Sequence, residues 1–306
     1  MIERVCVIGA GAIGSLYAAH LAQVVEVSVL TRREEHARAL DAEGLRVTGR
    51  SDLHSRVFAS ADPAELPEFD LGIVATKATA LDAAAARLAG RFEGATIMTI
   101  QNGLGAEEIV RRHGAWPLIS AVTFMSGNHL SDTHVEYVLD TSTWLGPYGD
   151  TPYATVVEAA ELIVASGLKA EAFADLRPAQ WSKLIFNATV NSVSALTGLP
   201  HSPHFAAERD ALDLGHLVHG LMDEGKRVAA AAGVPLHDDP WEMNVLATRR
   251  GSAHVPSMLE DVQARRPTEV DLITGALVRE ASRLGVDAPL HTAMYRLVKA
   301  REASYS

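Results

Sequence analysis

Three polar side chains stand at four-residue intervals in a largely apolar segment: Lys183, Asn187 and Asn191. Four residues make about one helical turn, so all three lie on one helix face. Buried polar groups need partners, and a polar ligand can supply them. The spacing therefore predicts a ligand-binding face. A solvent-exposed face that carries a lysine is the alternative that spacing alone leaves open.

A second polar segment lies further along the chain, from residue 254 to residue 271. Pro256 followed by Ser257 predicts the start of a helix. Thr268 and Glu269 predict the start of another, with apolar residues recurring at helical spacing behind them. A carboxylate in a first helical turn is commonly there because the helix dipole favours it. On this evidence alone, that ordinary explanation of Glu269 is preferred.

The N-terminal segment has the pattern of a dinucleotide site. An apolar run over 5–8 leads into a G-x-G-x-x-G turn, which a helical stretch and a β-branched run over 24–30 follow. In this context the first glycine permits the turn, the second admits a pyrophosphate and the third lets the helix pack closely. The helix start offers N–H groups to the phosphates. A glycine turn in some other α/β protein is the alternative. The predicted cofactor-binding residues of this turn are Gly9, Ala10, Gly11, Ala12, Ile13 and Gly14.

The residues at the tip of the second strand indicate which dinucleotide binds. The run ends Leu30-Thr31-Arg32-Arg33, with no carboxylate for a ribose 2′-hydroxyl. Arginine matches the geometry of a phosphate, so the sequence predicts NADP(H) over NAD(H). Arg32 is the first choice for the 2′-phosphate and Arg33 the second. At least one of them is expected to be a solvated charge at a helix start.

The order of the predicted elements sets the fold class. Apolar strands alternate with helices up to residue 174, which predicts a Rossmann-type, doubly wound parallel sheet. Runs at 135–139 and 142–146 suggest a hairpin within this part. Lys77 and Asn102 follow two of the strands, at the ends where such sheets bind ligands. From residue 175 helical spacing takes over, so we expect an all-helical domain over 175–306.

Composition narrows the functional class. The chain has 306 residues, 48% of them hydrophobic, and a formal charge of −11, which argues against broad nucleic-acid binding. No apolar stretch is long enough to span a membrane, and no signal-peptide pattern begins the chain. The single cysteine, Cys6, lies in a predicted strand and cannot form an internal disulfide. These points favour a cytoplasmic protein.

The histidines and the apolar helix faces bear on metals and partners. The histidines show no zinc-like spacing, so no metal is expected. His201 and His204 lie close together, but a surface loop is the preferred interpretation. The apolar faces of the helical domain suggest a homodimer.

These motifs together resemble the ketopantoate reductase (2-dehydropantoate 2-reductase) family over nearly the whole chain. The residues that carry the resemblance are Gly9 to Gly14, Thr76-Lys77, Gln101-Asn102-Gly103, Lys183 to Asn187 with Asn191, Pro256 to Asp261, Thr268 to Asp271, and Gly275.

The resemblance implies roles for the matched positions. Lys183 matches the general acid, and Glu269 matches an acidic residue that helps to order lysine and substrate. The positions that match substrate-binding residues are Asn102, Asn187, Asn191 and Ser257. Lys77 and Asn102 match residues that hold the cofactor near its nicotinamide end.

The implied activity is NADPH-dependent reduction of a 2-oxo acid, with 2-dehydropantoate as the first substrate to consider. Three departures leave the substrate open. Residues 119–127 lack a glycine that often precedes the Val-Thr pair, His254 stands where some members have asparagine, and 201–210 does not align clearly. The alternatives are an oxidoreductase for another 2-oxo or hydroxy acid, and a non-catalytic NADP(H)-binding regulator. A pure binder would not need the polar set of the second domain.

Overall fold

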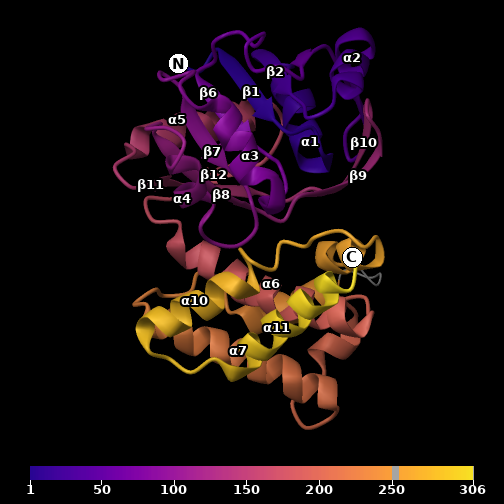
Figure 1. The fold of residues 1–306 in the computed structure, drawn as a ribbon, viewed down its shortest axis with the longest axis vertical. Helices are drawn as coiled ribbons and strands as arrows, with labels where there is room; N and C mark the ends of the chain where they lie inside the picture. Colours follow the sequence, from indigo (N-terminus) through magenta and orange to yellow (C-terminus); the bar gives the residue numbers. More distant parts are fainter. Residues whose placement is uncertain (250–254, 306) are drawn as a thin grey trace. The chain divides into compact units, whose positions relative to one another are not determined.

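The computed structural model describes residues 1–249 and 255–305. The chain forms two compact units (Figure 1). The first comprises residues 1–101 and 106–176, and the second comprises residues 102–105 and 177–306. The predicted roles of residues 1–174 in cofactor binding and 175–306 in substrate binding stay predictions. Among the described residues, no helix combines the length and apolar character that a membrane span requires.

The first unit contains all the strands of the described chain and five helices. Its strands are β1 (Arg4–Ile8), β2 (Glu26–Leu30), β3 (Leu45–Gly49), β4 (Leu53–Ser55), β5 (Phe58–Ser60), β6 (Leu71–Val74), β7 (Thr96–Thr99), β8 (Leu118–Thr123), β9 (Ser126–Ser131), β10 (His134–Leu139), β11 (Thr143–Tyr148) and β12 (Ala170–Ala172). Its helices are α1 (Ala12–Leu21), α2 (Glu34–Glu43), α3 (Ala78–Leu88), α4 (Ala106–Arg111) and α5 (Tyr153–Ala165).

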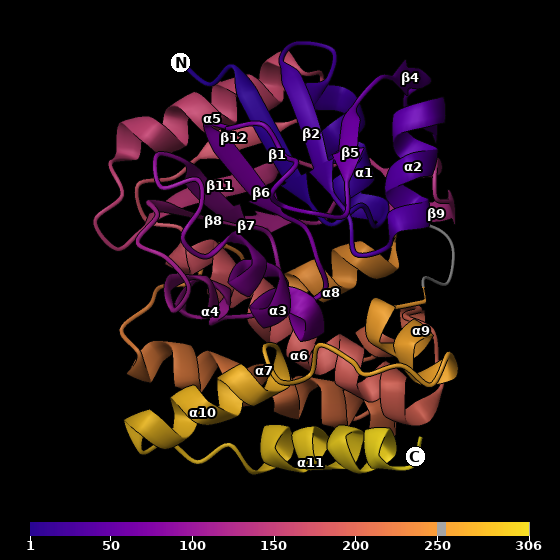
Figure 2. The ribbon, with the colours of Figure 1, turned by 45° about the horizontal axis from the view of Figure 1, so that its top comes forward.

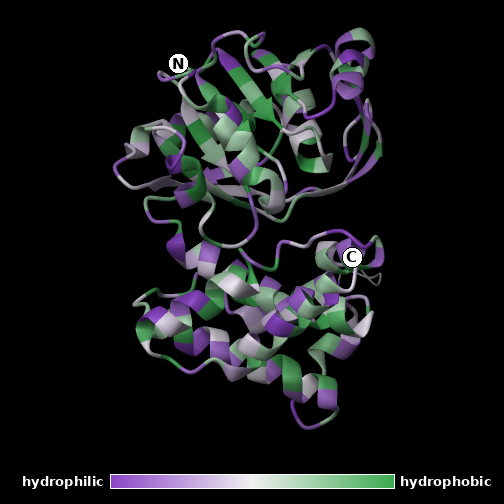
Figure 3. Ribbon diagram, in the orientation of Figure 1, coloured by the Kyte–Doolittle hydropathy of each residue, from purple (hydrophilic) through white to green (hydrophobic). Residues whose placement is uncertain are grey.

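Eight strands form the main sheet in the order β12-β11-β8-β7-β6-β1-β2-β5, which confirms the predicted doubly wound fold. All neighbouring pairs are parallel except β8 with β11. The apolar side chains of β1 and β6 are fully buried, as expected of a parallel sheet covered on both faces. In Figure 3 these strands form a hydrophobic stripe through the unit. The chain leaves β1 toward β2 on one side and later returns to β6 on the other, so a topological switch point lies between β1 and β6.

The predicted hairpin of residues 135–139 and 142–146 is wrong. Strand β10 lies in a second, four-stranded sheet of order β4-β3-β10-β9, whereas β11 pairs with β8 and β12 in the main sheet. Val135 and Tyr137 of β10 and Leu145 of β11 are all buried in the core of the unit. Burial of these apolar faces in two different sheets therefore overrides the pairing suggested by proximity in sequence.

The second unit confirms the predicted all-helical segment, since its described residues contain no strand. Its helices are α6 (Arg177–Thr197), the 3-10 turn η1 (Pro203–Ala206), α7 (Asp213–Ala231), α8 (Pro240–Thr248), α9 (Ser257–Gln263), α10 (Thr274–Leu284) and α11 (Pro289–Ala303). Helix α6 packs against the other five α-helices and is buried over most of its length (Figure 2). Helix α6 carries Lys183, Asn187 and Asn191.

The helix expected to start at Thr268 begins instead at Thr274. Residues 268–273 form a turn in which the amides of Leu272 and Ile273 both donate to the carbonyl of Glu269, each at 3.1 Å. The amide and hydroxyl of Thr268 donate to the Glu302 carboxylate, both at 2.7 Å. The bonds to Glu302 hold Thr268 against α11, so tertiary packing overrides the local helical preference.

The prediction that His201 lies in a surface loop is also wrong. Its side chain is buried, and its Nε2 lies 2.8 Å from the amide oxygen of Asn244. The ring meets Phe186 and Phe205 edge-on. His201 therefore fills the helical core, a role that aromatic neighbours remote in sequence make possible.

Candidate active site

The glycine turn lies at the switch point of the main sheet. Gly9 follows β1 with a φ of +101°, and a Cβ there would lie 2.8 Å from Thr76 Cγ2, beyond the end of β6. A Cβ on Gly14 would lie 1.9 Å from the carbonyl oxygen of Gly9. Any side chain at these two positions would clash, so both glycines are required by the packing of α1 against β1 and β6.

Gly11 differs from the other two glycines because its surroundings are open. It is exposed, and a Cβ there would meet no atom within 4 Å. It precedes α1 as the N-cap, and no side chain caps the helix. The first amides of a helix have no partner within it and attract anions. This open, uncapped helix start fits a cofactor pyrophosphate, with the glycine leaving space for it.

Gln101 has a structural role in this region that the sequence did not predict. Its amide Nε2 donates to the carbonyls of Val74 and Thr76, at 2.8 and 2.9 Å, and so ties the residue after β7 to the end of β6. The Gln101 Oε1 and Thr76 Oγ1 atoms are buried and have no hydrogen-bond partner among the described residues. Such atoms are rare in native proteins, and two of them near the end of β6 fit a polar ligand. An amide directly after a parallel strand was the available signal.

The two arginines after β2 differ in their partners. Arg33 pairs with the Asp132 carboxylate, with Nη2 2.5 Å from Oδ1. Arg32 is exposed, and within 1–249 and 255–305 its side chain has no hydrogen bond or ion pair. Lys77 is exposed at the N-cap of α3. Of the two arginines, Arg32 has the guanidinium that can take a phosphate without first breaking an ion pair.

The short segment 102–105 belongs to the second unit although its neighbours in sequence belong to the first. The amide of Leu104 donates to the carbonyl of Leu272 at 2.9 Å. Gly103 has a φ of +98°, and a Cβ there would lie 1.8 Å from the same carbonyl oxygen. Only glycine permits this approach, which places Asn102 beside the turn that carries Glu269.

A chain of polar side chains starts from this turn. Asn102 Nδ2 donates to Glu269 Oε2 at 3.2 Å, and Asn187 Nδ2 lies 3.5 Å from Asn102 Oδ1. Lys183 stands one turn before Asn187 on α6. Burial lowers the pKa of Lys183 to about 8, and the negative charge of Glu269 opposes that shift. The structure therefore brings together Asn102, Lys183, Asn187 and Glu269, four of the predicted site residues.

The turn that carries Glu269 is anchored to α11 on both sides. In addition to the bonds from Thr268 to Glu302, the Asp271 carboxylate accepts from Tyr295 Oη at 2.8 Å and from Lys299 Nζ at 3.1 Å. These contacts fix the residues on either side of Glu269, whose charge acts on Lys183 of α6. No local sequence signal marks the contributions of Glu302, Tyr295 or Lys299, because they arise only when α11 packs against the turn.

The remaining predicted substrate residues stand apart from this chain of contacts. Asn191 is buried one turn beyond Asn187 on α6. Ser257 is exposed at the start of α9. Within the described ranges, no hydrogen bond joins either side chain to Asn102, Lys183 or Glu269. His254 lies outside the described residues.

Comparison with known proteins covers both units. Residues 5–150 match the family model described as Ketopantoate reductase PanE/ApbA, and residues 175–302 match the model of the C-terminal part of the same family. A 2-dehydropantoate 2-reductase of Archaeoglobus fulgidus is 27% identical over 99% of both chains. The chain belongs to the ketopantoate reductase family. Its members are oxidoreductases that act on CH–OH groups with a nicotinamide cofactor, and this protein is one of them.

Solved structures agree with this family. A PanE/ApbA family ketopantoate reductase of Ralstonia eutropha superposes with a TM-score of 0.88, at 26% identity over 99% of both chains. D-mandelate dehydrogenase, solved with NADH and anilino(oxo)acetate, superposes with a TM-score of 0.87 over 99% of both chains. Its identity is only 23%, so it demonstrates the shared fold and leaves the substrate of this ketopantoate reductase family member undecided.

Proposed function

We propose that this protein reduces a 2-oxo acid to a 2-hydroxy acid with NADPH, and that 2-dehydropantoate, which would give pantoate, is its substrate. The observation that carries the proposal is the partly buried Lys183, with a pKa lowered to about 8, beside Glu269 and two asparagines. A lysine with such a pKa is largely protonated at neutral pH but gives up its proton more readily than an exposed one.

In this proposal Lys183 acts on the carbonyl oxygen of the substrate. The nicotinamide, when bound, supplies the hydride to the carbonyl carbon. The Lys183 ammonium stabilises the negative charge that develops on the oxygen and then donates its proton there. Glu269 favours the charged form of Lys183 before reaction. It thereby keeps the proton on the lysine against the effect of burial.

The asparagines bind the other oxygens of the substrate. Asn102 and Asn187 are already oriented by the hydrogen bonds that connect them to Glu269. Preorganised amides lose little freedom on binding and so position the acid for reaction. Asn191 extends this face by one turn of α6, and Ser257 is proposed to bind the substrate carboxylate.

The first unit supplies the cofactor site. Gly9 to Gly14 and the start of α1 fit the pyrophosphate, and the proposed partner of the 2′-phosphate is Arg32, because Arg33 is already paired with Asp132. The buried oxygens of Gln101 and Thr76 fit the part of the cofactor near the end of β6. Lys77 and Asn102 remain proposed partners near the nicotinamide.

A different 2-oxo acid is the second candidate, because D-mandelate dehydrogenase shares the fold at a TM-score of 0.87. The experiment is a steady-state assay of NADPH and NADH oxidation with 2-dehydropantoate and a panel of aliphatic and aromatic 2-oxo acids. Highest kcat/KM for 2-dehydropantoate with NADPH is expected. A preference for an aromatic acid would replace the substrate. No turnover despite tight NADPH binding would favour a regulatory binder. Size-exclusion chromatography of the same sample tests the predicted homodimer.

A further inference from the structure

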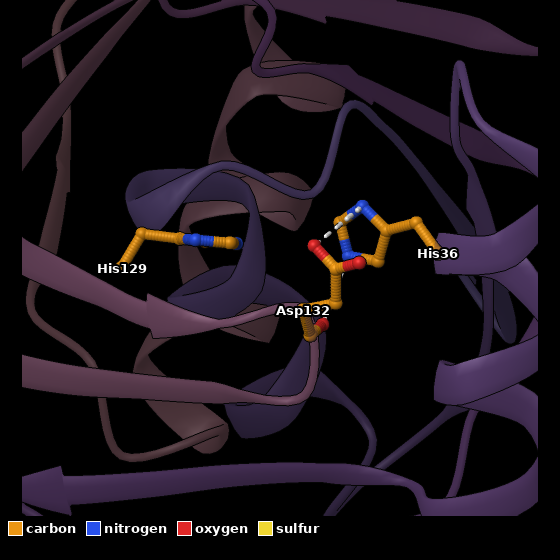
Figure 4. A group of neighbouring side chains, drawn as sticks. All are labelled: His36, His129 and Asp132. Carbon is orange, nitrogen blue, oxygen red and sulfur yellow. Dashed lines mark hydrogen bonds and ion pairs between the residues drawn. The ribbon is translucent and has the colours of Figure 1, made fainter.

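A second cluster of chemically active side chains lies in the first unit, away from the glycine turn. It consists of His36 from α2, His129 from β9 and Asp132 from the turn after β9 (Figure 4). One ligand atom from each residue lies within 4.8 Å of those from the other two. Figure 4 shows the two imidazoles on opposite sides of the Asp132 side chain. His129 and Asp132 are three positions apart, but His36 lies 93 positions before His129, so no sequence motif contains all three residues.

The hydrogen bonding of His36 fixes which of its nitrogens can bind a ligand. Its Nε2 lies 2.9 Å from the backbone carbonyl oxygen of Asp132, and a carbonyl only accepts, so Nε2 carries the proton. In the neutral ring, Nδ1 then bears a lone pair. The Nδ1 atom lies 3.8 Å from Asp132 Oδ1.

This arrangement has the features of a metal site. An Nε2–H held by a backbone carbonyl is a common way to orient a metal-binding imidazole. An imidazole nitrogen and a carboxylate oxygen that face each other are stabilised by a cation between them. His129 is exposed on β9, so its ring can approach the other two ligands without disturbing the core.

We propose that His36, His129 and Asp132 bind one divalent transition-metal ion of the zinc class. Two imidazoles and a carboxylate are typical zinc ligands, and water completes the coordination. Bonds of about 2.0–2.1 Å require the ligand atoms to approach to roughly 3.3 Å. The proposal therefore includes a small inward movement of His129. The bound ion would link α2 to the turn between β9 and β10.

Arg33 competes with the proposed ion for the Asp132 carboxylate. Its guanidinium already neutralises Asp132, at 2.5 Å from Oδ1, and it adds a positive charge beside the ligands. An ion that binds Asp132 must share or displace this partner. We therefore expect removal of the Arg33 charge to increase metal affinity, whereas removal of a ligand decreases it. A mere surface ion pair would show neither response to zinc.

The test is isothermal titration of the full-length, chelator-treated protein with Zn²⁺, accompanied by visible absorption spectra with Co²⁺. One saturable site per chain is expected. His129→Ala removes a ligand and should weaken the site by more than the roughly 10- to 100-fold that loss of an outer-shell partner costs, and Arg33→Gln should strengthen it. His216→Ala, an exposed histidine of the second unit, is the matched control and should change nothing.

The variants are exposed substitutions, and circular dichroism without metal verifies their folding. Absence of a saturable site in the wild type, or an unchanged affinity in folded His129→Ala, would overturn the proposal. An affinity that does not rise in Arg33→Gln would contradict the competition for Asp132. Asp132→Asn provides a second ligand variant, and it should also lose the site.

Discussion

The two units build their proposed sites in different ways. In the first unit the proposed site is formed mainly by the backbone: three glycines and an uncapped helix start occupy six consecutive residues. In the second unit the proposed site is formed by side chains, and Asn102, Lys183 and Glu269 come from three distant segments. A site made by backbone needs the absence of side chains, whereas a site made by side chains needs supports. The units should therefore fail differently when altered.

The largest expected effect is confined to the chemistry of the second unit. Lys183→Ala removes the proposed proton donor, and general acid catalysis commonly contributes roughly 10²- to 10⁴-fold. We expect kcat to fall by that factor while the Kd for NADPH, from fluorescence titration, stays unchanged. Lys183→Arg, which keeps the charge but cannot readily release its proton, should remain nearly as slow. Normal turnover in either variant would remove Lys183 from the mechanism.

Two glycine substitutions compare the units directly. Gly11→Ala adds a methyl in open space, so the melting temperature should hold while NADPH binding weakens by about 1–3 kcal/mol. Gly103→Ala would place its Cβ 1.8 Å from the Leu272 carbonyl and strain a left-handed backbone. It should instead lower kcat and cost about 1–3 kcal/mol of stability. Identical phenotypes from the two variants would contradict the distinction between a site formed by backbone and a site formed by side chains.

Substitution of Arg32 tests how the first unit binds the 2′-phosphate of the cofactor. Arg32→Ala should raise the KM for NADPH by roughly 10- to 100-fold, since a hydrogen bond to a charged group contributes about 1.5–3 kcal/mol. The KM for NADH should hardly change. Arg33→Ala is the matched variant and should have the smaller effect, because Arg33 is paired with Asp132. A larger loss in Arg33→Ala would reverse the assignment.

A buried pair makes the second unit sensitive to acid. Glu224 accepts hydrogen bonds from the Leu290 amide and from His291. Burial would raise the pKa of Glu224, but these bonds lower it below its ordinary value; burial lowers the pKa of His291. The unfolded state therefore binds more protons in acid, and stability should fall as pH drops from about 6.5 through 4.5. Chemical denaturation against pH tests this. Glu224→Gln should cost about 1–3 kcal/mol at neutral pH and remove the part of the slope that lies near and below pH 4.5, whereas the part that His291 contributes nearer pH 6.5 should remain. An unchanged slope below pH 4.5 would exclude Glu224 as its cause.

The same difference between the units explains what the sequence could predict. The glycine turn and its flanking strands are local, so spacing identified them, and the alternation of strands and helices predicted the doubly wound parallel sheet. The helix face of Lys183 was also local. By contrast, the hairpin at β10 and β11 and the helix start at Thr268 were wrong, because distant packing decided both. Asn102 lies beside Glu269 because of the Leu104–Leu272 contact, which no pattern within either segment indicates. The family resemblance assigned a role to each residue but did not predict their contact.

The smallest expected effect is a shift in a pH profile. Glu269→Gln removes the charge that raises the pKa of Lys183, so the pKa should fall below about 8. The alkaline limb of the rate profile should then move to lower pH. Asn102→Ala, which removes a hydrogen-bond donor to Glu269 but no charge, is the control and should leave the limb nearly in place.

The most direct test of the central claim is the pH dependence of kcat/KM for 2-oxo acid reduction by the wild-type enzyme. If Lys183 donates the proton, its protonated form is lost as the pH rises, and the rate should decline above about pH 8. A profile that stays level until the ordinary lysine pKa of about 10.4 would contradict the proposal that the partly buried Lys183 is the general acid.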